Sequence, residues 1–470
     1  MTLRELTAFP AELVAAYGRN DATRARVLAV QQARAAALVD VARRTRRYAG
    51  LSTWEHAPIT DKTALLARFD DGLVPGAPRL SAVEKFLQTG TPGTLLDDRF
   101  IVATTSGTTG EVGVFVVDDA SFARLRATTF ARIFRGQLRA EGFALLARRR
   151  YRLTFVVATG GHTMTSVLAL RMPRAGRVAA DVDIVSIADP LPKMVARLND
   201  KPPMLLHSYA TVLEVLAHEQ LAGRLHIQPE IITAGSEVLT SSAKAVLREA
   251  FAQATILETW AATEHVGLAV ACCLGHLHVN EDAAIVEPVD VNFRPVGQGE
   301  WSEHVLITNL LNHTQPLLRY RLDDRVRIDT APCPCGSPFV RVDVEGRTDD
   351  TIFLNDGADF QAHTPIPFET TLLGVPGLLQ FALVHEAQNA LRCRIVVHAG
   401  VEAAVVEAAV AARVLRHLTD HGLLQHVTFT VEVVDGLQRH QGSGKLRQIT
   451  STVSRPQRYV AAATRRREQP

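Results

Sequence analysis

The sequence predicts an α/β protein with a large N-terminal domain and a small, mobile α+β C-terminal domain. In the first half, short apolar runs alternate with helical stretches, which is typical of parallel α/β layers. The strand-like runs are Leu153–Ala158, Pro203–His207 and Glu230–Thr233, and Ala243–Ala252 is a helical stretch. Between residues 265 and 345 short strands with turns indicate a small β-rich subdomain. We therefore expect a large domain at 1–346 and a C-terminal lid at 347–470.

Individual elements follow from local patterns. Ala22–Arg47 has apolar residues at helical spacing and is expected to form an amphipathic helix. Arg99–Ala103 is a short strand that runs into a loop rich in threonine and glycine. The C-terminal unit has the order β-β-α-β, a compact arrangement with a core of its own. Its expected elements are Leu378–His385, Ala390–His398, Val401–Leu418 and His426–Val434.

Composition excludes several classes of protein. The 51 basic and 49 acidic residues give a net charge of +2, so charge indicates neither nucleic acid nor membrane as a partner. The first residues make a poor signal peptide, and no apolar run approaches the ~18 residues of a membrane span. Five cysteines, an odd number in a long chain, argue against a secreted disulfide framework and for a reducing cytoplasm.

The loop Thr104-Thr-Ser-Gly-Thr-Thr-Gly110 can wrap a polyphosphate. Its small hydroxyl residues and glycines expose backbone N–H groups without bulky side chains. It lacks the lysine spacing of the P-loop of NTPases. Taken alone, the loop could equally be an ordinary polar turn.

Four later segments carry groups that suit a nucleotide. Glu258–Glu264 places an aromatic ring beside a hydroxyl and a carboxylate, which could stack a base and bind a divalent metal. Arg319–Asp324 offers a carboxylate for ribose hydroxyls, and Gly346–Asp350 sits between the two units like a hinge. Gln441–Lys445 places one of only six lysines on a glycine-rich loop. Each segment alone could be a core or solvated-turn feature.

In their order and spacing, these five segments resemble the adenylate-forming superfamily of acyl-CoA synthetases, adenylation domains and luciferases. Within it, the chain most resembles the phenylacetate–CoA ligase family, from about residue 25 to 450. The resemblance implies that Lys445 is the adenylation lysine, Glu264 a catalytic residue and the magnesium ligand, and Asp349 the hinge. It implies that the nucleotide is bound by Thr105, Ser106, Gly107, Thr108, Thr109, Gly110, Gly235, Ser236, Glu237, Glu258, Thr259, Trp260, Thr263, Asp324 and Arg347.

Three positions depart from the family pattern. Glu111 stands where the family usually has lysine, which places one phosphate contact in doubt. Trp260 replaces tyrosine, so it can stack but loses the phenol hydrogen bond, and Ala261 replaces glycine. Glu264 and Lys445 are both retained, so we expect an active enzyme rather than an inactive nucleotide-binding homologue.

Two short cysteine clusters predict a structural zinc site. Zn²⁺ takes four thiolate or imidazole ligands tetrahedrally, and some members of the resembled family hold zinc with such a pattern. The expected ligands are Cys272, His278, Cys333 and Cys335, with Cys273 or His276 as substitutes. Thiols without a metal are the alternative. Cys393 is expected to be a core residue.

The acid pocket is expected between strand-to-helix loops, although some of its residues could serve only for packing. Its expected lining residues are Gly161, His162, His207, Tyr209 and Ala234. The resemblance implies activation of a small, aromatic carboxylic acid by ATP and Mg²⁺, then transfer to coenzyme A. An amine acceptor, giving an amide, is the alternative. We expect a cytoplasmic enzyme with no nucleic-acid or membrane partner, and a homodimer is left open.

Overall fold

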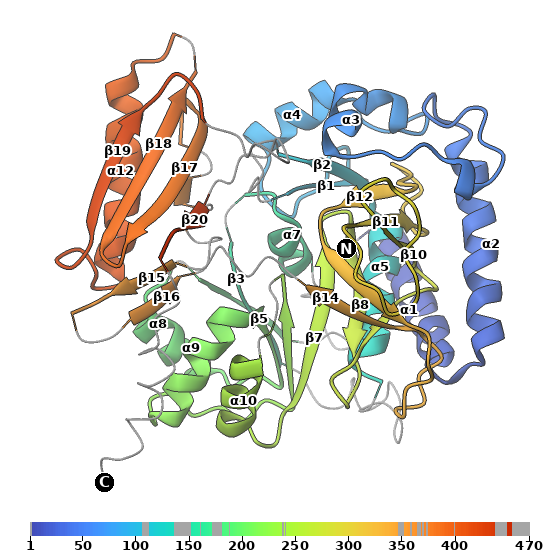
Figure 1. The fold of residues 1–470 in the computed structure, drawn as a ribbon, viewed down its shortest axis with the longest axis horizontal. Coiled ribbons are helices and arrows are strands. Elements are labelled where there is room, and N and C mark those ends of the chain that lie inside the picture. Colours follow the sequence, from blue (N-terminus) through green and yellow to red (C-terminus); the bar gives the residue numbers. More distant parts are fainter. Residues whose placement is uncertain are drawn as a thin grey trace.

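The structure, a computed structural model, confirms the α/β class. It describes residues 2–105, 112–135, 152–159, 161–171, 181–187, 189–236, 239, 241–345, 352–357, 360–363, 368, 371–372, 375–398, 400–437 and 449–453. The described part contains a large mixed sheet with helices packed against it, and a smaller unit beside it at the upper left of Figure 1.

The central sheet has nine strands in the order β13-β14-β9-β8-β7-β6-β5-β3-β4. Neighbouring strands from β4 to β7 pair in parallel, and those from β7 to β13 pair antiparallel. The parallel strands are β3 (Arg152–Val157), β4 (Asp181–Ser186), β5 (Leu205–Tyr209), β6 (Ile231–Gly235) and β7 (Thr255–Ala262). The remaining strands are β8 (His265–Ala271), β9 (Leu277–Val279), β13 (Arg325–Asp329) and β14 (Arg341–Glu345). The strands expected in the first half are therefore confirmed within a few residues.

Helices connect the parallel strands, as crossover connections require. These helices are α7 (Met164–Leu170), α8 (Leu191–Asp200), α9 (Ala210–Leu221) and α10 (Ser241–Ala250). The strands β5 and β6 are almost wholly buried and rich in β-branched and leucine residues, as expected for strands covered on both faces. One large apolar cluster runs through these elements and forms the main core.

The N-terminal helices cover the antiparallel half of the sheet. Here α1 (Leu3–Gly18) packs on α5 (Asp119–Ile133), which in turn packs on β8. Buried ion pairs join these helices, because Arg126 and Arg171 both contact the Glu5 carboxylate. The expected helix at Ala22–Arg47 is observed as α2 (Arg24–Ala42), and α3 (Lys62–Ala67) and α4 (Leu80–Thr89) follow it.

Two smaller sheets accompany the central one. The strands β1 (Phe100–Thr104) and β2 (Val114–Asp118) form an antiparallel pair, and β10, β11 and β12 form a three-stranded sheet. Their bounds are β10 (Ala284–Val289), β11 (His304–Asn309) and β12 (Tyr320–Leu322). The expected β-rich region thus divides between the central sheet and a sheet of its own.

The C-terminal elements form a separate core. The pattern β-β-α-β is observed as β17 (Leu378–Ala387), β18 (Ala390–Val397), α12 (Ala403–Asp420) and β19 (Thr428–Val433), with β20 (Ile449–Ser451) beside β17. A hairpin of β15 (Ile352–Asn355) and β16 (Phe360–His363) precedes them. Valines at Val406, Val410 and Val414 line the buried face of α12, at the spacing of one helix face.

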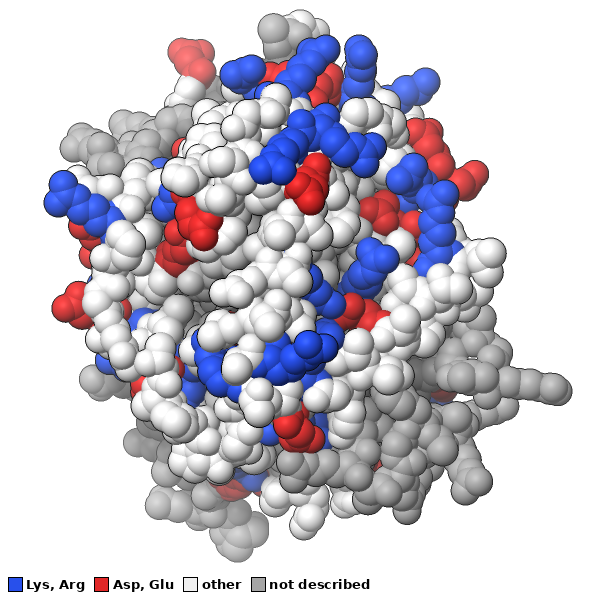
Figure 2. Space-filling view, turned by 90° about the vertical axis from the view of Figure 1, so that its right-hand side faces the viewer, with Lys and Arg blue, Asp and Glu red and all other residues white. Residues whose placement is uncertain are grey.

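The surface around α2 mixes both signs of charge. Figure 2 shows basic and acidic side chains side by side on this face, and ion pairs such as Arg43–Asp40 and Arg68–Asp71 join neighbours. Among the described residues, none of the helices combines the length and apolar character needed to cross a bilayer.

Candidate active site

The carboxyl ends of β5, β6 and β7 bring together residues of the expected acid pocket and nucleotide site. A Cβ atom placed on Gly235 would lie 2.8 Å from Thr259 Oγ1 and 3.2 Å from His207 Cε1. The three residues come from three neighbouring parallel strands, whose carboxyl ends are the usual ligand-binding edge of an open α/β sheet. A glycine at position 235 is therefore required by the close approach of its neighbours.

Hydrogen bonds fix the orientation of these groups. Thr259 Oγ1 donates to the Ala234 carbonyl over 3.0 Å, and His207 Nδ1 lies 2.9 Å from Thr233 Oγ1. Burial lowers the pKa of His207 to about 4, so its imidazole is neutral at neutral pH. Ser236 follows with φ of 65°, a left-handed conformation at the turn that leaves β6. A neutral ring thus lines the strand end where a carboxylate substrate is expected.

Three further residues expected in the acid pocket are Tyr209, His162 and Gly161. The buried Tyr209 hydroxyl accepts a hydrogen bond from the Ala158 N–H over 3.3 Å. His162 Nε2 donates to the Gly90 carbonyl over 3.3 Å, and burial lowers the pKa of this imidazole. Gly161 has φ of 70°, which favours glycine. Tyr209 and His162 therefore both make the packing contacts that were the alternative to a role in the pocket.

The structure describes the base of the expected phosphate loop, where β1 ends and β2 begins. The Thr105 N–H donates to the Gly113 carbonyl over 2.9 Å, and the Gly113 N–H donates to Thr105 Oγ1 over 2.8 Å. These bonds continue the β1–β2 pairing beyond Thr104. The following expected site residues lie outside the described part of the chain: Ser106, Gly107, Thr108, Thr109, Gly110, Glu237, Arg347, Asp349 and Lys445.

Glu264 occupies the turn between β7 and β8 and is 8% exposed. Burial raises the pKa of its carboxyl group, against the opposing effects of a hydrogen bond from Tyr320 and the positive charge of Lys62. The negative charge of Asp324 raises the pKa further. The structure therefore places the two expected acidic residues, Glu264 and Asp324, within electrostatic reach of each other.

Lys62 and Tyr320 are two site residues that the sequence analysis did not assign. Backbone hydrogen bonds from Thr60 to Arg319 and from Arg321 to Thr60 tie the start of α3 to β12. This pairing carries Lys62 toward Glu264 from a distant part of the sequence. The scarcity of lysine and the position of Tyr320 inside the Arg319–Asp324 segment were the available signals.

The other residues of the Glu258–Glu264 segment have different surroundings. Glu258 forms an ion pair with Lys244 over 2.9 Å and accepts from the Leu239 N–H. Trp260 is 7% exposed within the main core, and its Nε1 has no hydrogen-bond partner among the described residues. Thr263 is half-buried in the turn before Glu264. Glu258 and Trp260 are thus held by protein contacts.

The four expected zinc ligands lie together. Cys272, His278, Cys333 and Cys335 each offer a ligand atom, and these atoms all lie within 4.8 Å of one another. Cys272 follows β8, His278 is in β9, and the other two lie between β13 and β14. Cys273, the possible substitute, is exposed and stands apart from this group.

The surroundings of the cysteine cluster suit a cation. His278 Nδ1 donates to the Phe339 carbonyl over 2.7 Å, which leaves Nε2 to face Cys335 Sγ at 3.4 Å. A ligating histidine commonly has such an outer hydrogen bond, which fixes its tautomer. Cys393, in contrast, is wholly buried in the C-terminal core, as expected.

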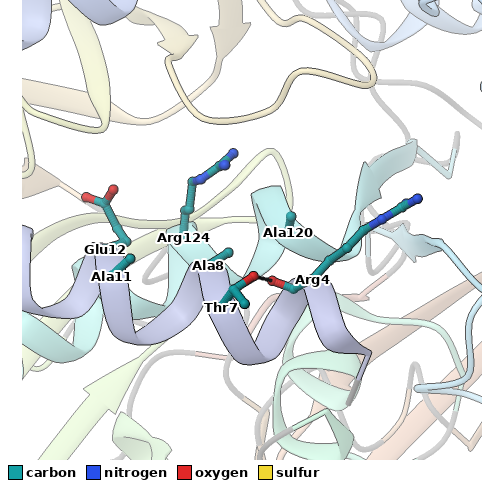
Figure 3. Close-up of a pocket in the computed structure, with 7 residues that line it drawn as sticks. All are labelled: Arg4, Thr7, Ala8, Ala11, Glu12, Ala120 and Arg124. Atoms are coloured by element: carbon teal, nitrogen blue, oxygen red, sulfur yellow. Dashed lines mark hydrogen bonds between the residues drawn. The ribbon is translucent and has the colours of Figure 1, made fainter.

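A groove between α1 and α5 lies outside this site. It has a volume of about 510 Å³ and is lined by Arg4, Thr7, Ala8, Ala11, Glu12, Ala120 and Arg124. Figure 3 shows the Arg4, Arg124 and Glu12 side chains extending to the same side of the two helices. None of the expected site residues lines the groove.

Comparison with known proteins identifies the fold. No protein-family model and no curated protein sequence matches the chain. The structure is similar to 2-hydroxyisobutyryl-CoA ligase in complex with 2-HIB-AMP and CoA, in the thioesterification state. The TM-score is 0.57 at 18% identity, over 96% of this chain and 93% of that one.

Two further structures of that ligase agree. The postadenylation state with R3-HIB-AMP gives a TM-score of 0.51 at 18% identity, covering 95% of this chain and 93% of that chain. An open conformation with 2-HIB-AMP and CoA gives 0.50 at 17% identity, covering 90% and 91%. The chain therefore has the two-domain α/β fold of these adenylate-forming CoA ligases.

Proposed function

We propose that the chain uses ATP to activate a small, aromatic carboxylic acid as acyl-AMP and then transfers the acyl group to coenzyme A. In this proposal the enzyme resembles phenylacetate–CoA ligases, with residues 1–346 as the adenylation domain and 347–470 as the lid. The shared fold with an acyl-AMP-binding CoA ligase supports the adenylation chemistry. The aromatic substrate rests on the sequence resemblance.

The observation that carries the proposal is the set of charged groups at Glu264. A buried carboxylate with a raised pKa, beside a lysine and a second carboxylate, is an uncommon arrangement for a purely structural turn. It lies directly after β7, whose Thr259 contacts the Gly235 turn. Glu264, Asp324 and Gly235 come from three motifs of the resembled superfamily.

The reaction would proceed in two steps. A carboxylate oxygen of the acid attacks the α-phosphorus of ATP, and the bond to the β-phosphate oxygen breaks to release pyrophosphate. The sulfur of coenzyme A then attacks the acyl carbon, its thiol proton is released to solvent, and the bond between the acyl carbon and the AMP oxygen breaks, so that AMP leaves. In the first step Lys445 would offset the charge that develops on the phosphate, and residues 105–110 would hold the leaving phosphates. The lid would then turn about Asp349 and withdraw Lys445.

The residues at Glu264 fit a magnesium ion. Hard cations prefer carboxylate oxygens, and a buried Glu264 next to Asp324 supplies such oxygens close to the proposed nucleotide. Bound there, magnesium would offset negative charge on the phosphate oxygens. Asp324 would accept hydrogen bonds from the ribose hydroxyls, and Arg347 would lie near the ribose.

The cysteine cluster fits a structural zinc ion. Three sulfur atoms and one imidazole nitrogen complete the four ligands that Zn²⁺ prefers, so no position is left open for substrate. An ion there would join the β8–β9 hairpin to the β13–β14 connection. Its proposed contribution is therefore to stability, and not to the transfer reaction.

Pyrophosphate release tests the proposed function most directly. The purified chain is incubated with Mg·ATP and a panel of aromatic and aliphatic acids, and pyrophosphate is measured with and without each acid. We expect release that depends on an aromatic acid, with acyl-AMP detectable by mass spectrometry. Absence of acid-dependent release across the panel, in protein that is folded and binds ATP, would favour an inactive nucleotide-binding homologue.

A further inference from the structure

A second cluster of metal-ligand side chains lies in the C-terminal unit, apart from the cysteine cluster. His417 lies in the last turn of α12, His421 follows directly after this helix, and His363 ends strand β16. His417 and His421 are four residues apart, so both rings project from one side of the helix end. His363 and His417 are each 6% exposed and His421 is half-buried. Three imidazoles therefore meet at the edge of an apolar core.

The separations of the ring nitrogens are compatible with a shared metal ion. One ligand nitrogen from each ring lies within 4.8 Å of the others, and His417 Nε2 is 3.4 Å from His363 Nδ1. Two nitrogens bound to a tetrahedral zinc ion at ~2.0–2.1 Å would lie ~3.4 Å apart. The same 3.4 Å separation also allows a hydrogen bond between the two rings, one that is long against the ~2.9–3.0 Å typical of N–H···O bonds.

Outer hydrogen bonds prepare His421 to act as a ligand. Its Nδ1 lies 2.8 Å from the His417 carbonyl, which can only accept, so this nitrogen carries the proton. The lone pair is then on Nε2, the atom available to a metal. Gln361 donates to the His421 carbonyl and to the Asp356 carboxylate, which fixes the turn behind the ring. Ligating histidines usually have supports of this kind.

The two buried rings, His363 and His417, are suited to the neutral, metal-binding form. Burial lowers the pKa of His417 to about 3 and that of His363 well below its ordinary value. Positive charge on the neighbouring His421, His417 and His385 would lower the pKa of His363 further. Among the described residues, His363 Nε2 is buried without a hydrogen-bond partner, so His417 is the polar contact of this ring.

We propose that His363, His417 and His421 bind one divalent transition-metal ion of the zinc class, with water in the fourth position. Imidazole nitrogens favour Zn²⁺, Co²⁺, Ni²⁺ and Cu²⁺, whereas oxygen ligands favour Mg²⁺. The ion would join the β15–β16 hairpin to the end of α12 and so hold two parts of the C-terminal unit together. This site is independent of the proposed ligase activity and of the cysteine cluster.

Cobalt binding distinguishes this site from the cysteine cluster. We would use the full chain with Cys272→Ser and Cys335→Ser, remove metal with a chelator and titrate with Co²⁺. A site made of imidazoles gives d–d bands in the visible but lacks the near-ultraviolet thiolate-to-cobalt charge-transfer band, which needs a sulfur ligand. We expect one equivalent of Co²⁺ with such a spectrum, displaced by Zn²⁺. Failure of this protein to bind Co²⁺ while it remains folded would overturn the proposal.

Ligand variants complete the test in the same background. His421→Ala should weaken Co²⁺ binding at least ~10-fold, since changes in outer-sphere partners alone cost that much. His398→Ala, a histidine of the same unit outside the cluster, should leave binding unchanged. His421→Cys should restore binding and add the thiolate charge-transfer band in the near ultraviolet. Unchanged binding in His421→Ala, or a folded His421→Cys protein that binds cobalt without the new band, would refute ligation by His421.

Discussion

At the scale of one residue, Glu264 shows how a functional group can lower the stability of the protein without bound ligands. Burial raises the pKa of its carboxyl group above the unfolded value. Its ionisation therefore opposes folding, by an amount that grows as the pH rises from the unfolded to the folded pKa. A bound cation would remove this penalty. Natural proteins commonly keep such unfavourable groups where function needs them.

Glu264→Gln is therefore expected to separate stability from activity. The neutral amide removes the buried charge, so the midpoint of thermal unfolding at pH 7 without ligands should rise. Adenylation should slow by at least ~10-fold and need more magnesium, because an amide is a weaker ligand for a hard cation. Thermal melts and pyrophosphate release over a magnesium titration measure the two effects.

Glu219→Gln is the matched control for this change. Glu219 pairs with the exposed Arg224 and has no part in the site, so the rate and the magnesium dependence should stay near the wild type. A Glu264→Gln protein with normal rate and magnesium dependence would show that the carboxylate does not serve the reaction.

Gly235→Ala tests the close approach at the ends of the parallel strands. The new Cβ would lie 2.8 Å from Thr259 Oγ1, closer than such contacts occur, so the turn must shift. We expect weaker binding of both ATP and acid, with a loss of stability of about 1–3 kcal/mol from overpacking. Calorimetric binding and denaturant unfolding would measure these changes.

A second substitution tests whether the contact with Thr259 causes the loss of stability in Gly235→Ala. In Gly235→Ala with Thr259→Ala, the contact with Thr259 Oγ1 is removed while the 3.2 Å approach to His207 Cε1 remains. Part of the lost stability should therefore return, so the two substitutions should be non-additive. Gly18→Ala, with open space around its Cβ position, is the control glycine and should change neither property. Additive losses in the double variant would contradict the proposed contact.

The residues also show how far the sequence could predict the site. The motifs assigned both Glu264 and Asp324 to the nucleotide and its metal, and in the structure the charge of Asp324 raises the pKa of Glu264. Lys62 could not be assigned, because its approach depends on pairing between Thr60 and Tyr320, which is not visible in local sequence. A motif identifies residue types, but long-range strand pairing decides which further residues join them.

At the scale of elements, the cysteine cluster depends on hairpins that meet across the sheet. His278 pairs with Arg341 in the ladder between β9 and β14, which brings the connection carrying Cys333 and Cys335 to the end of β8. Spacing alone predicted that the two cysteine groups would meet. Local sequence could not predict which elements hold these cysteines, or that four strands of the β-rich region join the central sheet, because both depend on tertiary contacts.

Substitution of adjacent cysteines tests the zinc proposal. Cys272→Ser should lose most of the bound zinc and lower the midpoint of thermal unfolding, because one of four ligands is removed. Cys273→Ser changes an exposed neighbour outside the cluster and should retain zinc and stability. Elemental analysis of protein purified without chelator, together with thermal melts, gives both results. Equal zinc content in the two variants, or none in the wild type, would contradict a site at Cys272.

At the scale of the whole molecule, the described C-terminal elements have an apolar core of their own, and a domain boundary near residue 346 stays a prediction from the sequence pattern. The C-terminal cluster from Ile352 to Ile449 is separate from the main core around the parallel strands. A lid that delivers one lysine to a site on the other unit would use this division. The short linking segment and Lys445 lie outside the described residues, so the movement is a proposal from the motifs alone.

Lys445→Ala is expected to affect only the first half of the reaction. Loss of this charge should reduce pyrophosphate release at least ~100-fold, since an electrostatic donor acts on the charge of the transition state. Transfer from chemically prepared acyl-AMP to coenzyme A should remain within a few-fold of the wild type. Lys201→Ala, an exposed lysine on the large unit, should leave both steps unchanged. Near-normal pyrophosphate release by Lys445→Ala would refute the assignment.

The identity of the acceptor is the remaining prediction, and it belongs to the whole molecule because the acceptor must reach the adenylate after the lid has moved. The proposed function, which rests on the resemblance of the sequence motifs to acid–CoA ligases, favours a thiol over an amine. Acyl-AMP formed from a competent acid should therefore be consumed faster by coenzyme A than by any amine at equal concentration. Parallel reactions with coenzyme A and a set of amines, followed by mass spectrometry, measure both products, and reactions without enzyme correct for uncatalysed aminolysis. If acyl-AMP accumulates in the presence of coenzyme A and an amine consumes it in an enzyme-dependent way, the chain is an amide-forming synthetase that shares the adenylation half of the proposed mechanism.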